Sequence, residues 1–187
     1  ARAARADVAN NSWGDSTGLY AIHDPAWRPM FDALDAAVRN GRGGLGTVFV
    51  FAGGNERKDR LDANYSNLTN HHETIAVAAV DRSGKPASYS SPGASLLVAA
   101  PAASVTSDRP GEEGYNDGSG ADLPDPDHTR SFGGTSAAAP VVSGVVALLL
   151  EAEPRLGYRD VKEILALSAQ RIETALGWER GAGSFWN

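Results

Sequence analysis

The chain has 187 residues and a formal net charge of −6, from 17 basic and 23 acidic side chains. This acidic balance lacks the basic footprint of a nucleic-acid-binding protein. The absence of cysteine excludes disulfide scaffolds, cysteine-ligated zinc and thiol nucleophiles. Because 42% of the residues are hydrophobic, the chain can bury a core. Length and composition therefore predict one folded domain, or part of a larger one.

No membrane span or signal peptide is predicted. The longest apolar stretch, residues 141–152, is shorter than the roughly 20 residues that cross a bilayer. The first residues contain no apolar segment, and the chain does not begin with methionine. We expect a piece of a longer chain.

The first predicted elements are a strand and a helix. Residues 8–13 predict a short strand that runs into a glycine-containing turn. Asp24 and Pro25 then supply a helix cap and a first-turn proline. Apolar residues recur at spacings of three and four as far as Val38, which predicts an amphipathic helix that ends at Gly41.

Three continuous apolar runs follow, at residues 47–52, 74–80 and 96–100. Continuous rather than alternating apolarity predicts strands buried on both faces, as in a parallel sheet covered by helices. Residues 106–130 are polar and rich in glycine and proline, which predicts a surface loop or ribbon.

Two helices are predicted at the end of the chain, over residues 136–151 and 158–170. We expect Pro140 in the first turn of the former, and close packing around Gly144. The order of elements predicts an α/β protein with a mostly parallel sheet flanked by helices.

Residues 132–140 carry the strongest chemical signal, with the sequence Phe-Gly-Gly-Thr-Ser-Ala-Ala-Ala-Pro. Ser136 opens a helix behind two glycines. Free N–H groups and a positive dipole at a helix N-terminus suit an alkoxide or oxyanion. The plainer interpretation is an ordinary serine cap at a glycine turn.

This string resembles the nucleophile motif of the subtilisin-like serine proteases, the subtilases. Residues 10–14 resemble the family's strand that pairs with substrate, and residues 41–55 its segment ending at the oxyanion-hole asparagine. Residues 89–101 resemble the loop and strand that follow. The amino-acid sequence is more similar to the kexin/furin branch than to subtilisin at residues 41–55, 147–154 and 158–161. The resemblance covers nearly the whole chain.

The resemblance implies that residues 1–187 are the C-terminal portion of one peptidase domain, with a sheet incomplete at its N-terminal side. It makes Ser136 the nucleophile and Asn55 the side-chain oxyanion donor, with the Ser136 N–H as the second donor. A polypeptide substrate would contact Ser12, Trp13, Gly14, Ala52, Gly53, Gly54 and Thr135. The alternatives are a loop role for Asn55 and core packing for Trp13.

The family's catalytic aspartate and histidine have no counterpart in this sequence. In the family they precede the serine in chain order. Neither an Asp-Thr-Gly-like nor a His-Gly-Thr-like motif occurs in this sequence. We interpret all four histidines as surface or loop residues: His23, His71, His72 and His128.

Three explanations remain for this departure. In the first, the chain is a fragment, and an N-terminal part that is absent or forms a separate chain supplies both residues. In the second, the chain is a truncated inactive domain. In the third, it is a pseudoprotease that only binds peptides. A weaker alternative is another hydrolase that uses a local histidine. A fragment would expose a sheet edge, so we expect the isolated chain to aggregate or to need its N-terminal partner.

Substrate preference and metal binding follow from the resemblance only in part. Kexin relatives cleave after basic residues, but Thr17 and Ser91 stand where that branch has carboxylates; Asp15 is placed differently. Acidity near Asn55 would come from Glu56, Asp59 and Asp62.

Calcium and a secreted, periplasmic or cell-surface location are expectations of the resemblance. We interpret the following acidic residues as a solvated loop rather than a Ca²⁺ site: Glu112, Glu113, Asp117, Asp122, Asp125 and Asp127.

Overall fold

The computed structural model describes residues 6–14 and 25–170. Four strands form one sheet in which all neighbours are parallel, in the order β1-β2-β3-β4. These strands are β1 (Val8–Asn11), β2 (Val48–Ala52), β3 (Thr74–Val80) and β4 (Leu96–Pro101). Among the described strands, β1 pairs with β2 alone, so its other edge is open. The prediction of a parallel α/β sheet is confirmed.

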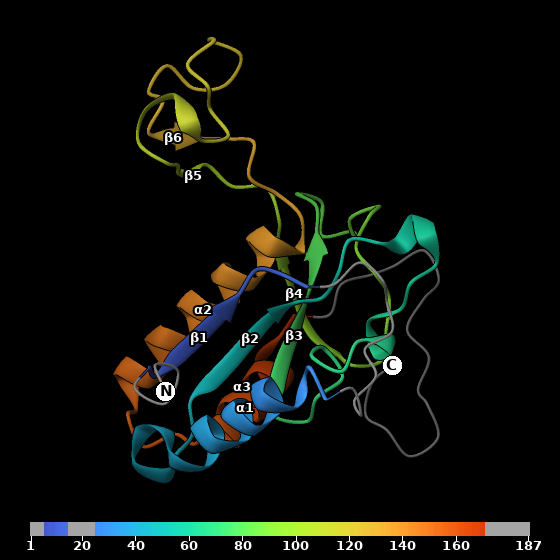
Figure 1. Cartoon of the computed structure of the whole chain (residues 1–187), viewed down its shortest axis with the longest axis vertical. Helices are drawn as coiled ribbons and strands as arrows, with labels where there is room; N and C mark the ends of the chain where they lie inside the picture. Colours follow the sequence, from blue (N-terminus) through green and yellow to red (C-terminus); the bar gives the residue numbers. More distant parts are fainter. Residues whose placement is uncertain (1–5, 15–24, 171–187) are drawn as a thin grey trace.

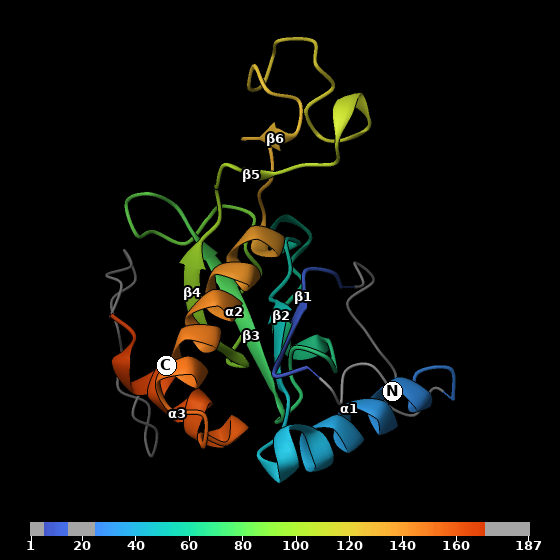
Figure 2. The same ribbon diagram turned by 90° about the vertical axis from the view of Figure 1, so that its left-hand side faces the viewer.

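Helices cover both faces of this sheet. α1 (Arg28–Asn40) lies on one face, and α2 (Thr135–Ala152) with α3 (Tyr158–Ser168) lies on the other (Figures 1 and 2). Short 3₁₀ turns occur in the connections: η2 (Gly41–Gly44), η3 (Arg57–Asp59), η4 (Ala63–Tyr65) and η5 (Gly111–Glu113).

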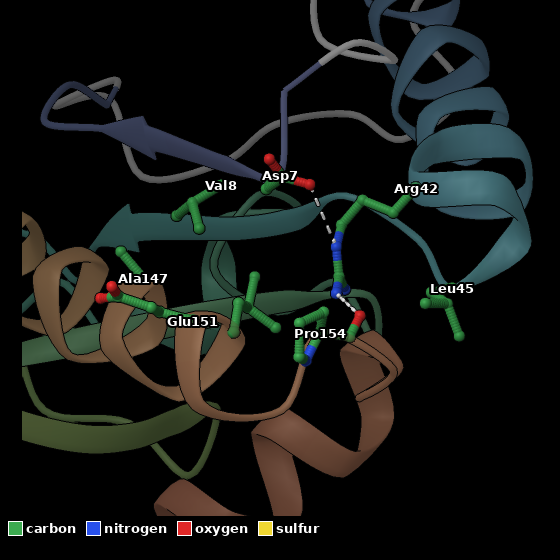
Figure 3. A pocket seen from close by; sticks show the side chains of 8 residues that line it. Asp7, Val8, Arg42, Leu45, Ala147, Glu151 and Pro154 are labelled. Carbon is green, nitrogen blue, oxygen red and sulfur yellow. Dashed lines mark hydrogen bonds and ion pairs between the residues drawn. The ribbon is translucent and has the colours of Figure 1, made fainter.

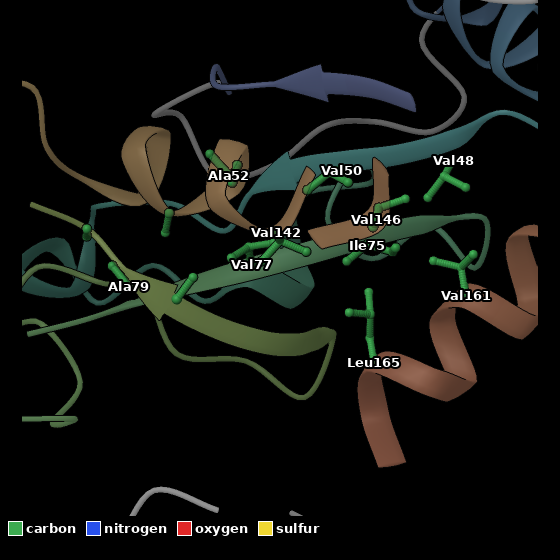
Figure 4. Close-up of a cluster of buried hydrophobic side chains, with 14 of the residues drawn as sticks. Val48, Val50, Ala52, Ile75, Val77, Ala79, Val142, Val146, Val161 and Leu165 are labelled. Atoms are coloured by element: carbon green, nitrogen blue, oxygen red, sulfur yellow. The ribbon is translucent and has the colours of Figure 1, made fainter. Parts of the chain in front are cut away.

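The alternation of side chains along β2 divides the core into two clusters. Val48, Val50 and Ala52 face α2 and α3 and join Val146 in the larger cluster (Figure 4). Phe49 and Phe51 point to the other face and pack under α1. Because both faces are covered, every residue of β2 is buried, as its continuous apolarity predicts.

One predicted helix start and one burial pattern were wrong. Residues 25–27 form a turn and α1 begins at Arg28, with Pro29 as the proline of its first turn; Asp24 lies outside the described residues. The strand at residues 96–100 is apolar along its length, yet only Ala100 is buried there. β4 has no further strand beside it among the described residues, which explains its exposure.

The long apolar helix also differs in two details from the prediction. α2 begins at Thr135, so Pro140 lies beyond the first turn and its missing N–H removes a helical hydrogen bond. A Cβ built on Gly144 meets no atom within 4 Å, so the expected close packing is absent among the described residues.

By length and composition, α2 is the one helix in the described part of the chain that could cross a membrane. It contacts all four strands of the sheet, and core helices of water-soluble proteins pass the same test.

Residues 102–132 project from the body of the molecule as a ribbon, as Figure 1 shows. Two short antiparallel strands, β5 (Thr106–Ser107) and β6 (His128–Thr129), close its base. The predicted ribbon is therefore confirmed, and its C-terminal end leads directly to the start of α2.

Candidate active site

The predicted site residues lie where the carboxyl ends of β1 and β2 meet the N-terminus of α2. In open parallel sheets, ligands bind outside the carboxyl ends of the strands. Ser12 follows β1, Asn55 follows β2, and Ser136 is the second residue of α2. Segments up to 124 residues apart thus converge on one end of the sheet.

Ser136 is half-buried at the start of the helix. No residue in the described part of the chain accepts a hydrogen bond from its backbone N–H or pairs with its hydroxyl. The preceding Gly134 has φ of 74°, and a Cβ there would lie 3.1–3.4 Å from the Asn55 amide atoms. Glycine is therefore required both for the turn and for the close approach of Asn55.

Asn55 is held by Thr135. Its Oδ1 accepts hydrogen bonds from the Thr135 N–H at 2.8 Å and the Thr135 hydroxyl at 3.0 Å. The hydroxyl in turn accepts the Gly54 N–H at 3.1 Å. Since Oδ1 is occupied on the helix side, Nδ2 of the exposed Asn55 is left to donate outward. The fully buried Thr135 side chain thus lies behind the amide and fixes its orientation.

Ser12 connects β1 to the N-terminus of α2. Its hydroxyl donates to the Ser136 carbonyl at 2.7 Å and accepts from Asn10 Nδ2 at 2.9 Å. In a regular helix, the carbonyl of residue 136 accepts a hydrogen bond from the N–H of residue 140, but Pro140 has no N–H. Proline therefore frees the acceptor that joins the two segments. The sequence alone did not show this link.

Trp13 and Gly14 continue from Ser12 at the open end of the site. The Trp13 ring packs edge-on against Phe51, with centroids 5.7 Å apart, yet remains 48% exposed. It is therefore partly a packing residue and partly available to a ligand. A Cβ on Gly14 would meet nothing, so this side of the cleft is open among the described residues.

A pocket lies beside Asn55, between Gly14 and the residues after β2. Its floor needs glycine, because a Cβ on Gly53 would lie 2.7 Å from the Val77 carbonyl oxygen. The pocket is lined by Gly14, Ala52, Gly53, Gly54, Glu56, Leu61, Asp62, Ala63, Ser66, Thr69 and Ser91. Sequence reasoning missed Leu61, Ala63, Ser66 and Thr69, which come from a loop without a recognisable motif.

Two carboxylates reach this pocket. Glu56 accepts the Asn55 N–H at 2.6 Å and lies 3.4 Å from the Ser91 hydroxyl. Asp62 caps a short turn by accepting the Asn64 N–H at 2.8 Å. Asp59 is exposed on η3 and does not line the pocket. Thr17 and Asp15 lie outside the described residues.

The described histidines lie away from Ser136. His71 and His72 precede β3, at the opposite end of the sheet. His128 belongs to the ribbon, where its Nδ1 pairs with Asp125 at 2.9 Å. His23 lies outside the described residues. Within the described residues, no base and no orienting carboxylate contact the Ser136 hydroxyl.

The acidic ribbon uses its carboxylates as acceptors for its own turns. Asp122 accepts from the hydroxyls of Thr129 (2.6 Å) and Ser131 (2.9 Å) and from the Arg130 N–H (2.9 Å). These bonds, the one from Thr129 first, lower the pKa of Asp122 to about 2. Among the described residues, the ribbon contains no group of three ligand atoms close enough for one cation.

Comparison with known proteins agrees with the motif reading. The model of the subtilase family matches residues 1–184. A calcium-dependent protease from Nostoc sp. is 36% identical over 191 residues, covering 92% of this chain and 28% of the relative. Kexin from Saccharomyces cerevisiae is 34% identical over 184 residues, covering 96% and 20%. The chain thus spans between a fifth and three tenths of these two relatives.

Among solved structures, the fold is also similar to that of a serine protease. The serine protease of Aeromonas sobria superposes with a TM-score of 0.84 at 24% identity, covering 96% of this chain and 40% of that one. At this identity the likeness concerns the fold alone.

Proposed function

Because this chain belongs to the subtilase family of serine proteases, we propose that residues 1–187 form the C-terminal portion of one kexin-like peptidase domain in which Ser136 is the nucleophile. One observation carries the proposal. Thr135 holds the Asn55 amide through its Oδ1 and leaves its Nδ2 as a donor near the N-terminus of α2. This side-chain donor and the free Ser136 N–H supply the kind of hydrogen-bond donors that acyl transfer requires.

In the proposed reaction the Ser136 oxygen bonds to the scissile carbonyl carbon. The carbonyl oxygen takes up negative charge between Asn55 Nδ2 and the Ser136 N–H. The tetrahedral species then expels the amine, and water hydrolyses the acyl-enzyme. A serine hydroxyl is a weak nucleophile until a base removes its proton. Among the described residues that base is missing, so we assign it to the N-terminal part of the same domain.

Two exposed features support a missing partner. The free edge of β1 has backbone groups ready to pair with another strand. On α2, Val141, Gly144, Val145 and Leu148 form an exposed stripe at helical spacing. A large apolar stripe beside an open strand edge indicates an interface. We propose that the N-terminal part of the domain covers both and brings the aspartate and histidine to Ser136.

A cavity at the far end of the same face adjoins this interface. It lies between the start of β1 and the end of α2, as Figure 3 shows, and has a volume of about 450 Å³. The side chain of Arg42 is almost wholly buried there, and it pairs with Asp7 at 3.3 Å and donates to the Pro154 carbonyl at 2.9 Å. Arg42 thus joins β1 to the end of α2 beside the surface that we assign to the N-terminal part.

We further propose that the pocket beside Asn55 receives a basic side chain from the substrate residue before the scissile bond. Its lining includes the carboxylates of Glu56 and Asp62. Glu56 uses its Oε2 and Asp62 its Oδ1 to accept backbone N–H groups. The second oxygen of each carboxylate is left to accept from a guanidinium or ammonium group.

Calcium is an expectation of the family resemblance, and the name of the calcium-dependent protease from Nostoc supports it. The described acidic ribbon does not fit a calcium site, because its carboxylates are bonded to donors of the protein itself. Ser91 is neutral and bonded to Glu56. We therefore assign no calcium ligand here and propose only that chelation lowers the activity of the complete protease.

Peptide hydrolysis by the complete protease tests the proposal. We expect Ser136→Ala to abolish turnover. We expect Asn55→Ala to lower kcat by about 10²–10³, the magnitude measured for such a donor in subtilisin, itself a member of this family. Full activity of Ser136→Ala would refute the assignment and favour one of the histidines. A folded, complete protein without hydrolytic activity would favour a peptide-binding relative.

A further inference from the structure

A second cluster of chemically active side chains lies at the end of the sheet opposite Ser136. Asp35 projects from α1, and His71 and Glu73 come from the segment that leads into β3. Each residue offers a ligand atom, and these atoms lie within 4.8 Å of one another. His71 Nε2 is 3.9 Å from Asp35 Oδ1. In the described part of the chain, no other group of this kind occurs.

Glu73 is the unusual member of this cluster. The residue is 8% exposed, and its Oε2 is buried without a hydrogen-bond partner. Its carboxyl group lies beside that of Asp35. Two carboxylates in contact repel each other unless a cation or a proton lies between them. A buried, unpaired carboxylate oxygen costs free energy that a bound ion would recover.

The surroundings hold the imidazole in place. The His71 ring stacks between Phe31, at 5.7 Å, and His72, at 4.8 Å. Its Nδ1 accepts the Glu73 N–H in a long 3.3 Å contact. This leaves Nε2 as the nitrogen that faces Asp35.

Nearby cations balance the cluster only in part. Arg39 pairs with the outer oxygen of Asp35 at 3.6 Å, and His72 lies 3.7 Å from Glu73 Oε1. The Lys162 ammonium donates to the carbonyl oxygens of His72 and Thr74 rather than to the carboxylates. Among the described residues, none of these cations is hydrogen-bonded to Glu73 Oε2.

We propose that Asp35, His71 and Glu73 bind a divalent transition-metal ion, with zinc as the best-fitting probe. An imidazole with two carboxylates suits zinc better than calcium, which takes oxygen ligands. In tetrahedral coordination with metal–ligand bonds of about 2.1 Å, two ligands of one ion lie about 3.4 Å apart. The widest pair of the cluster, at up to 4.8 Å, therefore needs to contract by about 1.4 Å, and the half-exposed Asp35 has room to move.

Coordination through Nε2 moves the ring proton of His71 to Nδ1. This breaks the 3.3 Å contact with the Glu73 N–H and leaves the total number of protons on the ring unchanged. A water molecule would complete four-coordination. The ion would join α1 to the start of β3, 38 residues apart, and would act as a structural clamp remote from Ser136.

The test is zinc titration of the complete protein carrying Ser136→Ala to prevent self-digestion, in a calcium-saturated buffer. Calorimetry gives the stoichiometry. We expect one zinc ion to be lost, or bound at least tenfold more weakly, in Glu73→Gln and in Asp35→Asn. The matched controls Asp32→Asn, on an exposed part of α1, and His128→Gln, in the ribbon, should leave this zinc in place.

A second measurement separates lost ligands from lost folding. Without metal, Glu73→Gln should melt at or above the temperature of the unmodified protein, because it removes a buried like-charge contact. Zinc should raise the melting temperature of the unmodified protein but not that of the variant. The proposal is overturned if zinc does not bind to the unmodified protein, or if Glu73→Gln binds it equally well. In that case Asp35 and Glu73 share a proton instead.

Discussion

At the scale of single residues, Thr135 links the backbone of one segment to the side chain of another. Its hydroxyl both accepts from Gly54 and donates to Asn55, while its own N–H donates to Asn55. A fully buried hydroxyl that satisfies two partners leaves unpaired groups behind when it is removed. Thr135 is therefore a positioning residue for the proposed oxyanion donor, although it touches no reacting atom.

Thr135→Val should preserve the shape of the side chain and lower kcat by about tenfold, the effect of one lost hydrogen bond. KM should change little, because the pocket is untouched. Steady-state kinetics of the complete protease measures both, with Thr135→Ser as the control that keeps the hydroxyl. An unchanged kcat in Thr135→Val would show that Asn55 is held without this contact.

Asp62→Asn should weaken the preference for arginine over leucine before the scissile bond. A charge-assisted hydrogen bond is worth about 1.5–3 kcal/mol, so we expect kcat/KM for the arginine peptide to fall at least tenfold. Asparagine still caps the turn through its side-chain oxygen, so folding should be preserved. Asp59→Asn removes the same charge outside the pocket and should have no effect. Equal losses in both variants would mean a general electrostatic effect.

At the scale of elements, the projecting ribbon has its own polar core. Asn116 is 1% exposed, and its amide donates to the carbonyl oxygens of Leu123, Asp125 and His128. Asp122 then binds the returning strand through Thr129, Arg130 and Ser131. Hydrogen bonds thus hold together a segment with few apolar side chains, next to the start of α2.

The ribbon should resist acid down to a pH near 2. The folded pKa of Asp122, about 2, lies below its ordinary value of 3.8. Its stabilising contribution is therefore present above pH 4 and is lost as the pH falls through 2. Amide hydrogen exchange at Arg130 and Ser131 should accelerate in that window. Asp122→Asn should remove this pH dependence of exchange. Acceleration that is already complete at pH 4 would contradict the proposed role of Asp122.

The elements also show how far the sequence could predict the structure. Continuous apolarity placed β2 and β3, and the nucleophile motif placed Ser136 and Asn55 at one site. The same pattern overestimated the burial of β4, because apolarity cannot show whether a strand has a neighbour. The Ser12–Ser136 link and the Asp35–Glu73 contact depend on tertiary proximity, so no local pattern contains them.

At the scale of the whole molecule, both edges of the described sheet, β1 and β4, lack a neighbouring strand, and the β1 edge adjoins an exposed apolar stripe on α2. The sheet ends at β1, and the stripe on α2 beside it includes Leu148, which is 66% exposed. Burying a leucine or valine side chain is worth about 1.5–3 kcal/mol. The exposed stripe is therefore costly to the isolated chain and favourable to a domain that covers it.

Replacing both Val145 and Leu148 by glutamate should have opposite effects in two settings. In residues 1–187 alone, the change should reduce aggregation, measured by light scattering. In the complete protease it should lower the melting temperature and the activity, because charges would enter an interface. The same two charges at Ala33 and Ala36, both exposed on α1 at the same spacing, serve as the control for added charge. A monodisperse, cooperatively melting isolated chain would contradict the proposed interface.

Labelling of the complete protease with a fluorophosphonate, followed by intact-mass measurement and peptide mapping, tests the central claim most directly. The account predicts a single adduct on Ser136, absent from Ser136→Ala and formed more slowly in Asn55→Ala. An adduct on another residue, or no adduct on a folded and complete protein, would contradict the assignment of Ser136 as the nucleophile.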